Sequence, residues 1–166
     1  MSRHDRSLQL VVPVVVVLIV SAVFAGAVGG ERVLVVERVD TGETILSVPV
    51  TEGTTIGLEY MHSVEKTRVY DGYEVDDDRL VNTRMEFESY GWGLPAGANV
   101  TRENGTFVYD PSCELSELYV KPGTVANHTL IVGERRFDLV ERAEAHSVRI
   151  HVERRSVLVS VIDRLR

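Results

Sequence analysis

The sequence predicts an all-β domain, a sandwich or partly open barrel of about ten short strands, preceded by one N-terminal transmembrane helix. Three observations support this fold class. Apolar and polar residues alternate through most of the chain after residue 30, with the period of two that half-buried strands have. Clusters of Gly, Pro, Asp and Asn interrupt the alternation at short intervals, as turns do. The first 28 residues instead contain a continuous apolar run.

That run, residues 8–28, is predicted to cross a membrane as a helix. It contains no charged residue, and a helix of 21 residues is long enough to span the hydrocarbon core of a bilayer. Arg3 and Arg6 precede it, so the positive-inside rule places residues 1–7 in the cytoplasm and residues 31–166 outside as an exported β-domain. The chain is therefore expected in the cell membrane with a single pass.

A cleaved signal peptide is the alternative for the same segment. Ala25, Gly26 and Ala27 resemble the small residues that precede a cleavage site. Cleavage near Ala27 would release a secreted domain. The apolar run is longer than the apolar region of a usual signal peptide, which favours the anchor.

Composition excludes some functions and describes the host. The net charge of −7 argues against a nucleic-acid partner, because phosphate binding requires a basic face. A single Cys excludes an intrachain disulfide and a zinc site made of cysteines. Sixteen of the 18 basic residues are Arg, and only Lys66 and Lys121 are Lys. An acidic, Lys-poor chain resembles a halophile protein, although high-GC codon usage produces the same bias.

Three of the four asparagines head glycosylation sequons. Asn99, Asn104 and Asn127 are each followed two positions later by Thr. Sequons indicate exposed loops of an exported protein in a host that glycosylates. The sequence therefore predicts an extracytoplasmic glycoprotein.

The predicted strands follow one another with short connections. Residues 140–146 have room for one or two helical turns, and the last two strands are expected to form a hairpin. The predicted strands are 32–39, 44–50, 54–64, 68–75, 80–89, 106–109, 115–120, 129–132, 135–139, 147–153 and 156–162.

Alternation assigns the faces of the three central strands. In the strand 54–64, His62 and Val64 share a face with apolar residues; in 68–75, Asp71 shares a face with Tyr73. In 80–89, Val81, Thr83, Met85, Phe87 and Ser89 fall on one face. The predicted core includes Ile56, Leu58, Tyr60, Val69, Tyr73, Val81, Met85 and Phe87.

The densest polar string of the chain, residues 60–67, contains the first candidate site residues. If the next strand pairs antiparallel, Asp71 also points inward and orients the imidazole of His62. Such a pair suits a general base or half of a metal site, although a His on an apolar face is more often a hydrogen-bonded core residue. Ser63 and Glu65 alternate to the opposite face, which argues against a Ser–His nucleophile along one strand.

A Gly-rich loop supplies the second group of candidates. Gly91 and Gly93 let a backbone approach a partner closely, and Trp92 between them suits an interface anchor or a side chain folded back on the core. His128, His146 and His151 are scattered and are expected at the surface or rim. We predict no metal, no cofactor and no catalytic residue. The predicted binding residues are His62, Ser63, Glu65, Tyr70, Asp71, Glu88, Gly91, Trp92 and Gly93.

Parts of the sequence resemble a known family. The matching strings are residues 60–69 (YMHSVEKTRV), 88–95 (ESYGWGLP) and, more weakly, 127–133 (NHTLIVG). Together they resemble the domain of unknown function 1850 family over about residues 33–153. Family members often have Pro at the position of Arg68 and Ala at that of Trp92, so the ligand of the Gly-rich loop does not carry over. The resemblance implies a small exported β-domain, often encoded beside tripartite TRAP-type solute transporters, without an established activity.

Two classes of function are compatible with the sequence. The first is a membrane-anchored β-domain that is accessory to a solute transporter and contacts its permease or its solute receptor. The second is an exported hydrolase or metal-dependent enzyme that uses His62, Asp71 and Glu65. The missing catalytic arrangement favours the first class.

Overall fold

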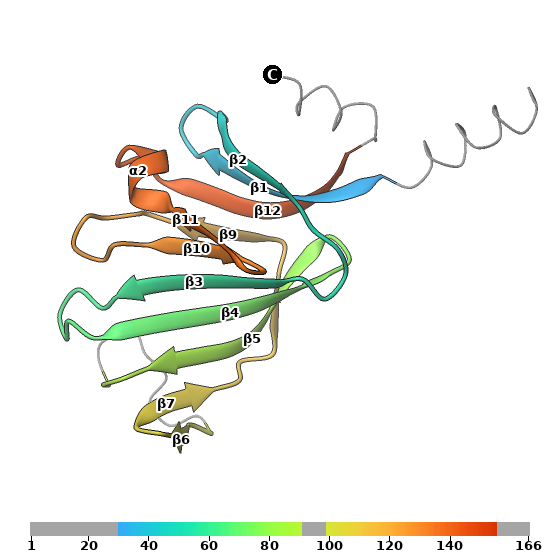
Figure 1. Ribbon diagram of the computed structural model, residues 1–166. Coiled ribbons are helices and arrows are strands. Elements are labelled where there is room, and N and C mark those ends of the chain that lie inside the picture. Colours follow the sequence, from blue (N-terminus) through green and yellow to red (C-terminus); the bar gives the residue numbers. More distant parts are fainter. Residues whose placement is uncertain (1–29, 91–98, 156–166) are drawn as a thin grey trace, which may run out of the picture. The chain divides into compact units, whose positions relative to one another are not determined.

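The computed structural model describes residues 30–90 and 99–155 (Figure 1). Residues 32–153 form one compact unit. Within the described part no helix is both long and apolar enough to cross a membrane. The predicted anchor, residues 8–28, lies outside the described residues, as does the predicted strand 156–162.

The strands form two open sheets, which we call the small and the large sheet. The small sheet has the order β2-β1-β12-β9, and the large sheet has the order β11-β10-β3-β4-β5-β7-β6 with β8 paired to β5. The small-sheet strands are β1 (Glu31–Arg38), β2 (Thr44–Pro49), β9 (Glu117–Val120) and β12 (Val148–Arg155). The large-sheet strands are β3 (Thr55–Met61), β4 (Arg68–Asp76), β5 (Arg79–Phe87), β6 (Thr101–Glu103), β7 (Thr106–Tyr109), β8 (Cys113–Leu115), β10 (Thr129–Val132) and β11 (Arg135–Asp138). The predicted all-β class is confirmed, and no closed barrel forms among the described residues.

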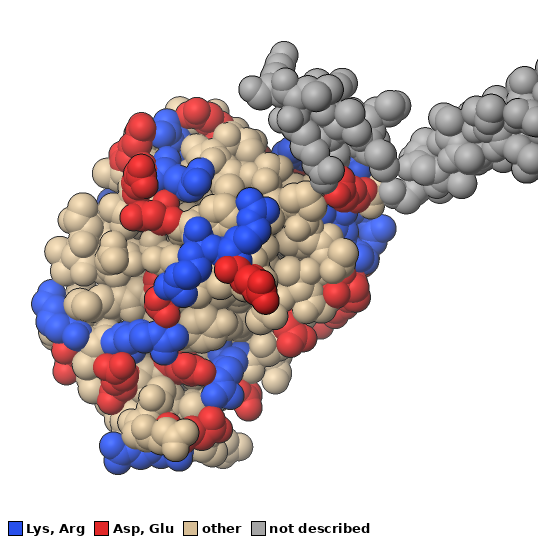
Figure 2. Space-filling view, viewed as in Figure 1, with Lys and Arg blue, Asp and Glu red and all other residues tan. Residues whose placement is uncertain are grey.

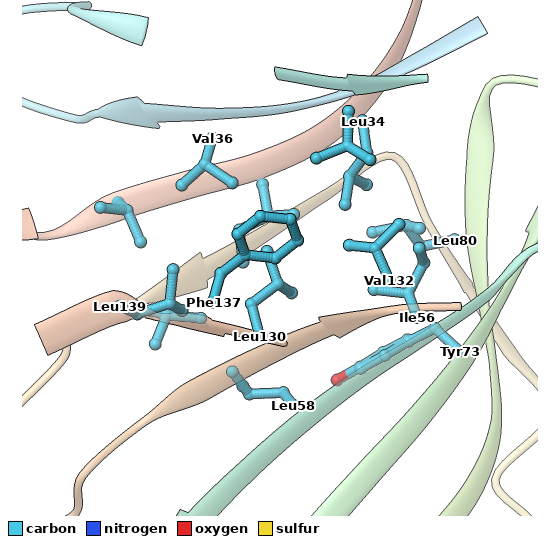
Figure 3. Close-up of a cluster of buried hydrophobic side chains, with 14 of the residues drawn as sticks. Leu34, Val36, Ile56, Leu58, Tyr73, Leu80, Leu130, Val132, Phe137 and Leu139 are labelled. Atoms are coloured by element: carbon cyan, nitrogen blue, oxygen red, sulfur yellow. The ribbon is translucent and has the colours of Figure 1, made fainter. Parts of the chain in front are cut away.

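One hydrophobic cluster joins the two sheets. Figure 3 shows Leu34 and Val36 of β1 above Leu130 and Val132 of β10, with Phe137 of β11 between them. At roughly 25 cal/mol for each Å² of apolar surface removed from water, this burial is the main stabilising term of the domain. The face of the large sheet that carries this cluster is called the inner face below, and the opposite face is the outer face.

One short helix closes the end of β11. It is α2 (Leu139–Ala143), and its N-cap Asp138 accepts hydrogen bonds from the backbone N–H groups of Val140 and Glu141 at 2.8 and 3.0 Å. Its C-cap Glu144 has left-handed backbone angles, which end the helix. The prediction of one or two helical turns in this region is confirmed.

A β-bulge in β5 changes which residues face the core. Gly72 pairs with Arg84 and Tyr73 pairs with Asn82, so Thr83 is an extra residue without a partner of its own. The alternation reverses at this point. Leu80 and Asn82 are therefore buried before the bulge and Phe87 after it. The prediction that Val81 shares the inner face with Phe87 is wrong, since Val81 pairs with exposed Glu74. Alternation along one strand cannot reveal an inserted residue.

Several predicted boundaries also change. The strand predicted for residues 54–64 ends at Met61, so His62 and Val64 are not strand residues. The strand predicted for residues 115–120 is two strands, because β8 pairs within the large sheet and β9 within the small one. The short strand β6 was not predicted. The remaining predicted strands agree with the structure within about two residues at each end.

Candidate functional site

Residues 62–67 form a tight loop between β3 and β4. The backbone N–H of His62 donates to the carbonyl of Thr67 at 2.8 Å, and Lys66 N–H donates back to the His62 carbonyl at 2.9 Å. The Nδ1 atom of His62 accepts from the backbone N–H of Val64 at 3.4 Å and of Glu65 at 3.2 Å. Lys66 has a left-handed backbone with φ of 56°. The loop is thus held by its own hydrogen bonds, and His62 organises it as an acceptor.

Two other segments lie beside this loop. The hydroxyls of Thr67 and Ser89 are 3.5 Å apart, which places the residues after β5 next to the loop. The backbone N–H of Met61 donates to the carbonyl of Ala126 at 2.7 Å, which places the connection before β10 on the other side. The three segments that carry the family resemblance therefore meet at one end of the large sheet. We call this end, residues 61–67, 88–90 and 121–128, the loop edge.

The loop edge exposes apolar side chains. Six large apolar residues are exposed in the described part of the chain, and four belong to the loop edge. Their exposed fractions are 42% for Met61, 68% for Val64, 48% for Tyr90 and 59% for Val125. Exposed apolar residues gathered at one place mark an interaction surface more often than single ones do.

The loop edge also contains both lysines of the chain. Lys66 lies in the β3–β4 loop and Lys121 follows β9, and both are exposed. Ser63, Glu65 and Glu88, which the sequence predicted as binding residues, are exposed at the same edge. The structure therefore brings His62, Ser63, Glu65 and Glu88 together on one surface.

Asp71 belongs to a different place, the inner face of the large sheet. It pairs with Leu58 of β3 and Met85 of β5 and is only 7% exposed. The Tyr60 hydroxyl donates a hydrogen bond to its carboxylate. The other carboxylate oxygen, Oδ1, is buried and accepts no hydrogen bond. Asp71 therefore faces Tyr60, and the predicted pairing of Asp71 with His62 on a shared strand face does not form.

Tyr73 and Asn82 extend this polar group. They are direct partners in the β4–β5 ladder, and the Asn82 amide donates to the Tyr73 hydroxyl. Asn82 is 8% exposed, and its Oδ1 is also buried without a hydrogen-bond partner. We call Tyr60, Asp71, Tyr73 and Asn82 the inner cluster. Buried polar atoms without partners are uncommon in folded proteins, so two of them side by side need an explanation.

Burial dominates the ionisation of the inner cluster. It raises the pKa of Asp71 to about 6, although the hydrogen bond from Tyr60 acts in the opposite direction. Burial also raises the pKa of Tyr60 and of Tyr73, and the nearby charge of Asp71 adds to both increases. Both phenols thus remain protonated at neutral pH, while Asp71 is ionised there.

His128 is the imidazole that stands next to this cluster. Its ring stacks on that of Tyr60, with centroids 5.2 Å apart and planes 17° from parallel. The sequence predicted His128 at the surface or rim; its ring is half-buried, and burial lowers its pKa. His128 directly precedes β10, which has only four residues, so the alternation along β10 did not indicate the contact of His128 with Tyr60.

The outer face of the large sheet carries a charged network instead. Glu86 receives hydrogen bonds from Arg84 at 2.7 Å and from Arg68 at 3.2 Å, and these lower its pKa. Burial alone would raise the pKa of Glu59, but hydrogen bonds from Arg68 and Arg136 outweigh it and lower the pKa. Figure 2 shows such interleaving of acidic and basic side chains over the visible face. The network consists of Arg136, Glu59, Arg68, Glu86, Arg84 and Glu103.

Tyr70 lies within this network, on the opposite face from Asp71. A Cβ atom on Gly57 would come within 2.6 Å of the Tyr70 ring, so only Gly at this position leaves room for it. The guanidinium of Arg68 lies 5.5 Å from the ring centroid. The structure thus separates Tyr70 from the other predicted binding residues.

The Gly-rich loop and the sequons complete the predicted set. Gly91, Trp92 and Gly93 lie outside the described residues, so their predicted role remains a prediction. Asn99, Asn104 and Asn127 are all exposed.

Two of the three sequon asparagines also have a structural reason. Asn104 and Asn127 have left-handed backbone angles, with φ of 50° and 51°, which Asn tolerates better than most residues. Asn104 and Gly105 form the two-residue turn between β6 and β7. The sequon pattern therefore follows partly from turn chemistry, and glycosylation itself stays a prediction.

The metal-dependent alternative required three side chains in one place. Within the ranges 30–90 and 99–155, no three His, Cys, Asp or Glu side chains are grouped closely enough to hold a metal ion. Glu65 belongs to the loop edge, whereas Asp71 lies on the inner face with Tyr60.

Comparison with known proteins identifies one similarity. The family described as Domain of unknown function (DUF1850) matches residues 56–139, which extend from β3 to the start of α2 and make up half of the chain. No curated protein and no solved structure matches the chain. The matched range contains the whole loop edge and the whole inner cluster.

Proposed function

The chain belongs to the DUF1850 family, and on that premise we propose that it is a membrane-anchored extracytoplasmic β-domain whose loop edge binds a component of a solute transporter. The observation that carries this proposal is the grouping of exposed apolar side chains, among them Val64 and Val125, on loops that the family resemblance covers. Apolar and aromatic side chains at the centre of an interface supply most of its binding energy.

The loops of the loop edge are held in fixed conformations by hydrogen bonds, which favours the binding of a protein partner. The β3–β4 loop is closed by backbone hydrogen bonds and by the acceptor Nδ1 of His62. The connection before β10 is similarly closed, since Asn127 N–H donates to the Gly123 carbonyl at 2.9 Å. A surface ordered before binding loses less conformational entropy when its partner arrives.

The proposed membrane anchor is supported by the sequence alone. Residues 8–28 form an uncharged run of sufficient length, with Arg3 and Arg6 before it. In Figure 1 the chain enters the small sheet through β1 at the right, whereas the β3–β4 loop lies at the left. The start of β1 and the β3–β4 loop therefore lie at different ends of the domain.

The partner class comes from the family resemblance, which implies genes beside those of tripartite solute transporters. The permease or the solute receptor of such a transporter is the expected partner. The mixed charges of the loop edge, Lys66 and Lys121 beside Glu65 and Glu88, offer polar contacts around its apolar residues.

A photo-crosslinking amino acid at Val64 tests the interaction. In native membranes we expect one crosslinked product, which contains the permease or the solute receptor. The same amino acid at Tyr119 is the matched control, because Tyr119 is another exposed large side chain but lies on β9 of the small sheet. Equal products from both positions, or none from Val64, would contradict the proposal.

Membrane extraction tests the anchor separately. Carbonate and salt washing should leave the full-length chain in the membrane pellet. A mature protein that begins near Val28 would instead identify the signal-peptide alternative and a secreted domain.

A further inference from the structure

We propose that the inner cluster is a binding site for a small ligand with a primary ammonium group, held between Asp71 and Asn82. This inference does not depend on the loop edge or on its partner. It rests on two buried oxygen atoms without hydrogen-bond partners, on their place on one face of neighbouring strands and on the charge of Asp71.

The two unpaired atoms are both acceptors. Asp71 and Asn82 are each more than nine-tenths buried, and each has one Oδ1 atom without a donor. Leaving such an atom unpaired destabilises the folded state, and more so for a charged group. A ligand that satisfies both must therefore supply at least two N–H or O–H donors.

These two acceptors lie on the same face of the large sheet, beside the bulge at Thr83. Asn82 lies opposite Tyr73, and Asp71 is two residues before Tyr73 on the same face of β4. Diagonal neighbours in an antiparallel ladder are about 7–8 Å apart at Cα, with their Cβ atoms closer. One small group can therefore reach both side chains. Bulges are common beside binding sites because they redirect a side chain in this way.

The surroundings of Asp71 select a cation. The groups that face it are the Tyr60 hydroxyl from β3, Tyr73 on its own strand, and Asn82 and Met85 from β5. In the ranges 30–90 and 99–155, no Arg, Lys or His forms an ion pair with it. A positive partner stabilises the charged form of a buried carboxylate. The ligand therefore supplies that charge.

The side chains of the inner cluster favour an ammonium group over a metal ion. A hard cation such as Ca²⁺ needs six or more oxygen ligands, and the described residues provide no group of three acidic or metal-binding side chains. A primary ammonium has three N–H donors, enough for Asp71 and Asn82 together. The inner cluster also contains the aromatic rings of Tyr60 and Tyr73. Cations are stabilised against aromatic faces.

The test uses methylammonium chloride as the probe and the full-length chain in detergent micelles. At pH 8, where Asp71 is ionised, we expect the melting temperature to rise with methylammonium concentration and to saturate. Potassium chloride and tetramethylammonium chloride at equal ionic strength should not reproduce the rise, because neither cation has an N–H donor. At pH 5 the same probe should act more weakly.

Two variants locate the response. Asp71→Asn keeps an acceptor for Tyr60 but removes the charge, so its half-saturation concentration should rise by at least about tenfold. Glu134→Gln removes an exposed carboxylate in the turn between β10 and β11, outside both the inner cluster and the loop edge, and should respond like the wild type. Methyl resonances of the probe in saturation-transfer NMR measure the same binding without relying on unfolding.

Three results would overturn the proposal. An equal response in Asp71→Asn would place the ligand elsewhere. An equal response to potassium would reveal a general salt effect or a metal site. No saturable response by either method would leave a bridging water as the donor to both oxygens.

Discussion

Asn82 lies directly opposite Tyr73 in the β4–β5 ladder and donates its amide hydrogen to the Tyr73 hydroxyl. Directly after this pair, Thr83 is inserted into β5 and reverses the alternation of the residues that follow. This one inserted residue explains why Asn82 and Phe87, which are out of phase in the sequence, are both buried.

Deletion of Thr83 should leave a folded domain. Without it, Asn82 still pairs with Tyr73 and Met85 with Asp71, and the ladder between them becomes regular. Deletion of Glu59 is the matched control, because β3 pairs without a bulge and a missing residue moves half of the strand to the wrong face. Cooperative urea unfolding is expected for the Thr83 deletion only. Loss of the transition in both proteins would contradict this account of the bulge.

Alternation predicted the regular strands well. Ile56, Leu58, Val69 and Tyr73 are buried as expected, because β3 and β4 pair without interruption along these residues. In an uninterrupted ladder every second residue of each strand lies on the same face, beside inward residues of the neighbouring strand. The core of the large sheet could therefore be predicted from the period of two up to the bulge.

The candidate site was less predictable, because it depends on two local events. His62 continues the apolar alternation of β3 in the sequence, but the backbone turns after Met61 and the imidazole closes a loop. Asn82 is out of phase with Phe87 in the sequence, and only the bulge places both on the inner face. Neither a turn position nor an insertion leaves a signal in a periodicity that is averaged over a strand.

The stability of the domain should depend on Asp71 in mildly acidic solution. Burial raises the pKa of this carboxyl to about 6 in the folded state, whereas the unfolded chain has the ordinary value of 3.8. Between these values the folded state binds more protons, so the stabilisation by protonated Asp71 is lost as the pH rises from about 4 to about 6. The Asn variant cannot ionise. The free energy of unfolding of the Asn variant, relative to that of the wild type, should therefore increase across this pH window. The total increase should be about 1–3 kcal/mol, with no further change at higher pH.

Urea unfolding of both proteins between pH 4.5 and 8 measures this difference. The lowered pKa values of Glu59 and Glu86 act in the opposite sense, since their contribution is lost as the pH falls, but they are present in both proteins and cancel. A constant difference between the two proteins across the window would contradict the assignment to Asp71.

Gly57→Ala should displace the ring of Tyr70. The new Cβ atom would lie 2.6 Å from Cε2 and 2.9 Å from the hydroxyl oxygen of Tyr70, so the ring must leave its place beside Arg68. We expect the free energy of unfolding to fall by about 1–2 kcal/mol. The cost should become smaller in a Tyr70→Ala background, which a double-mutant cycle measures. Gly123→Ala is the control, since a Cβ there meets no atom within 4 Å.

His62→Ala should loosen the β3–β4 loop, and His62→Asn should largely preserve it. Alanine removes the acceptor for the backbone N–H groups of Val64 and Glu65, which lie 3.4 and 3.2 Å from Nδ1. The Oδ1 atom of asparagine can occupy the position of Nδ1 and accept the same hydrogens. Amide hydrogen exchange of Val64 and Glu65 is therefore expected to accelerate in the Ala variant and to stay close to the wild type in the Asn variant. Exchange in β4 should be similar in all three proteins, because the ladder between β3 and β4 does not involve this side chain. Equal acceleration in the Asn and Ala variants would show that the imidazole orders the loop through a contact other than Nδ1.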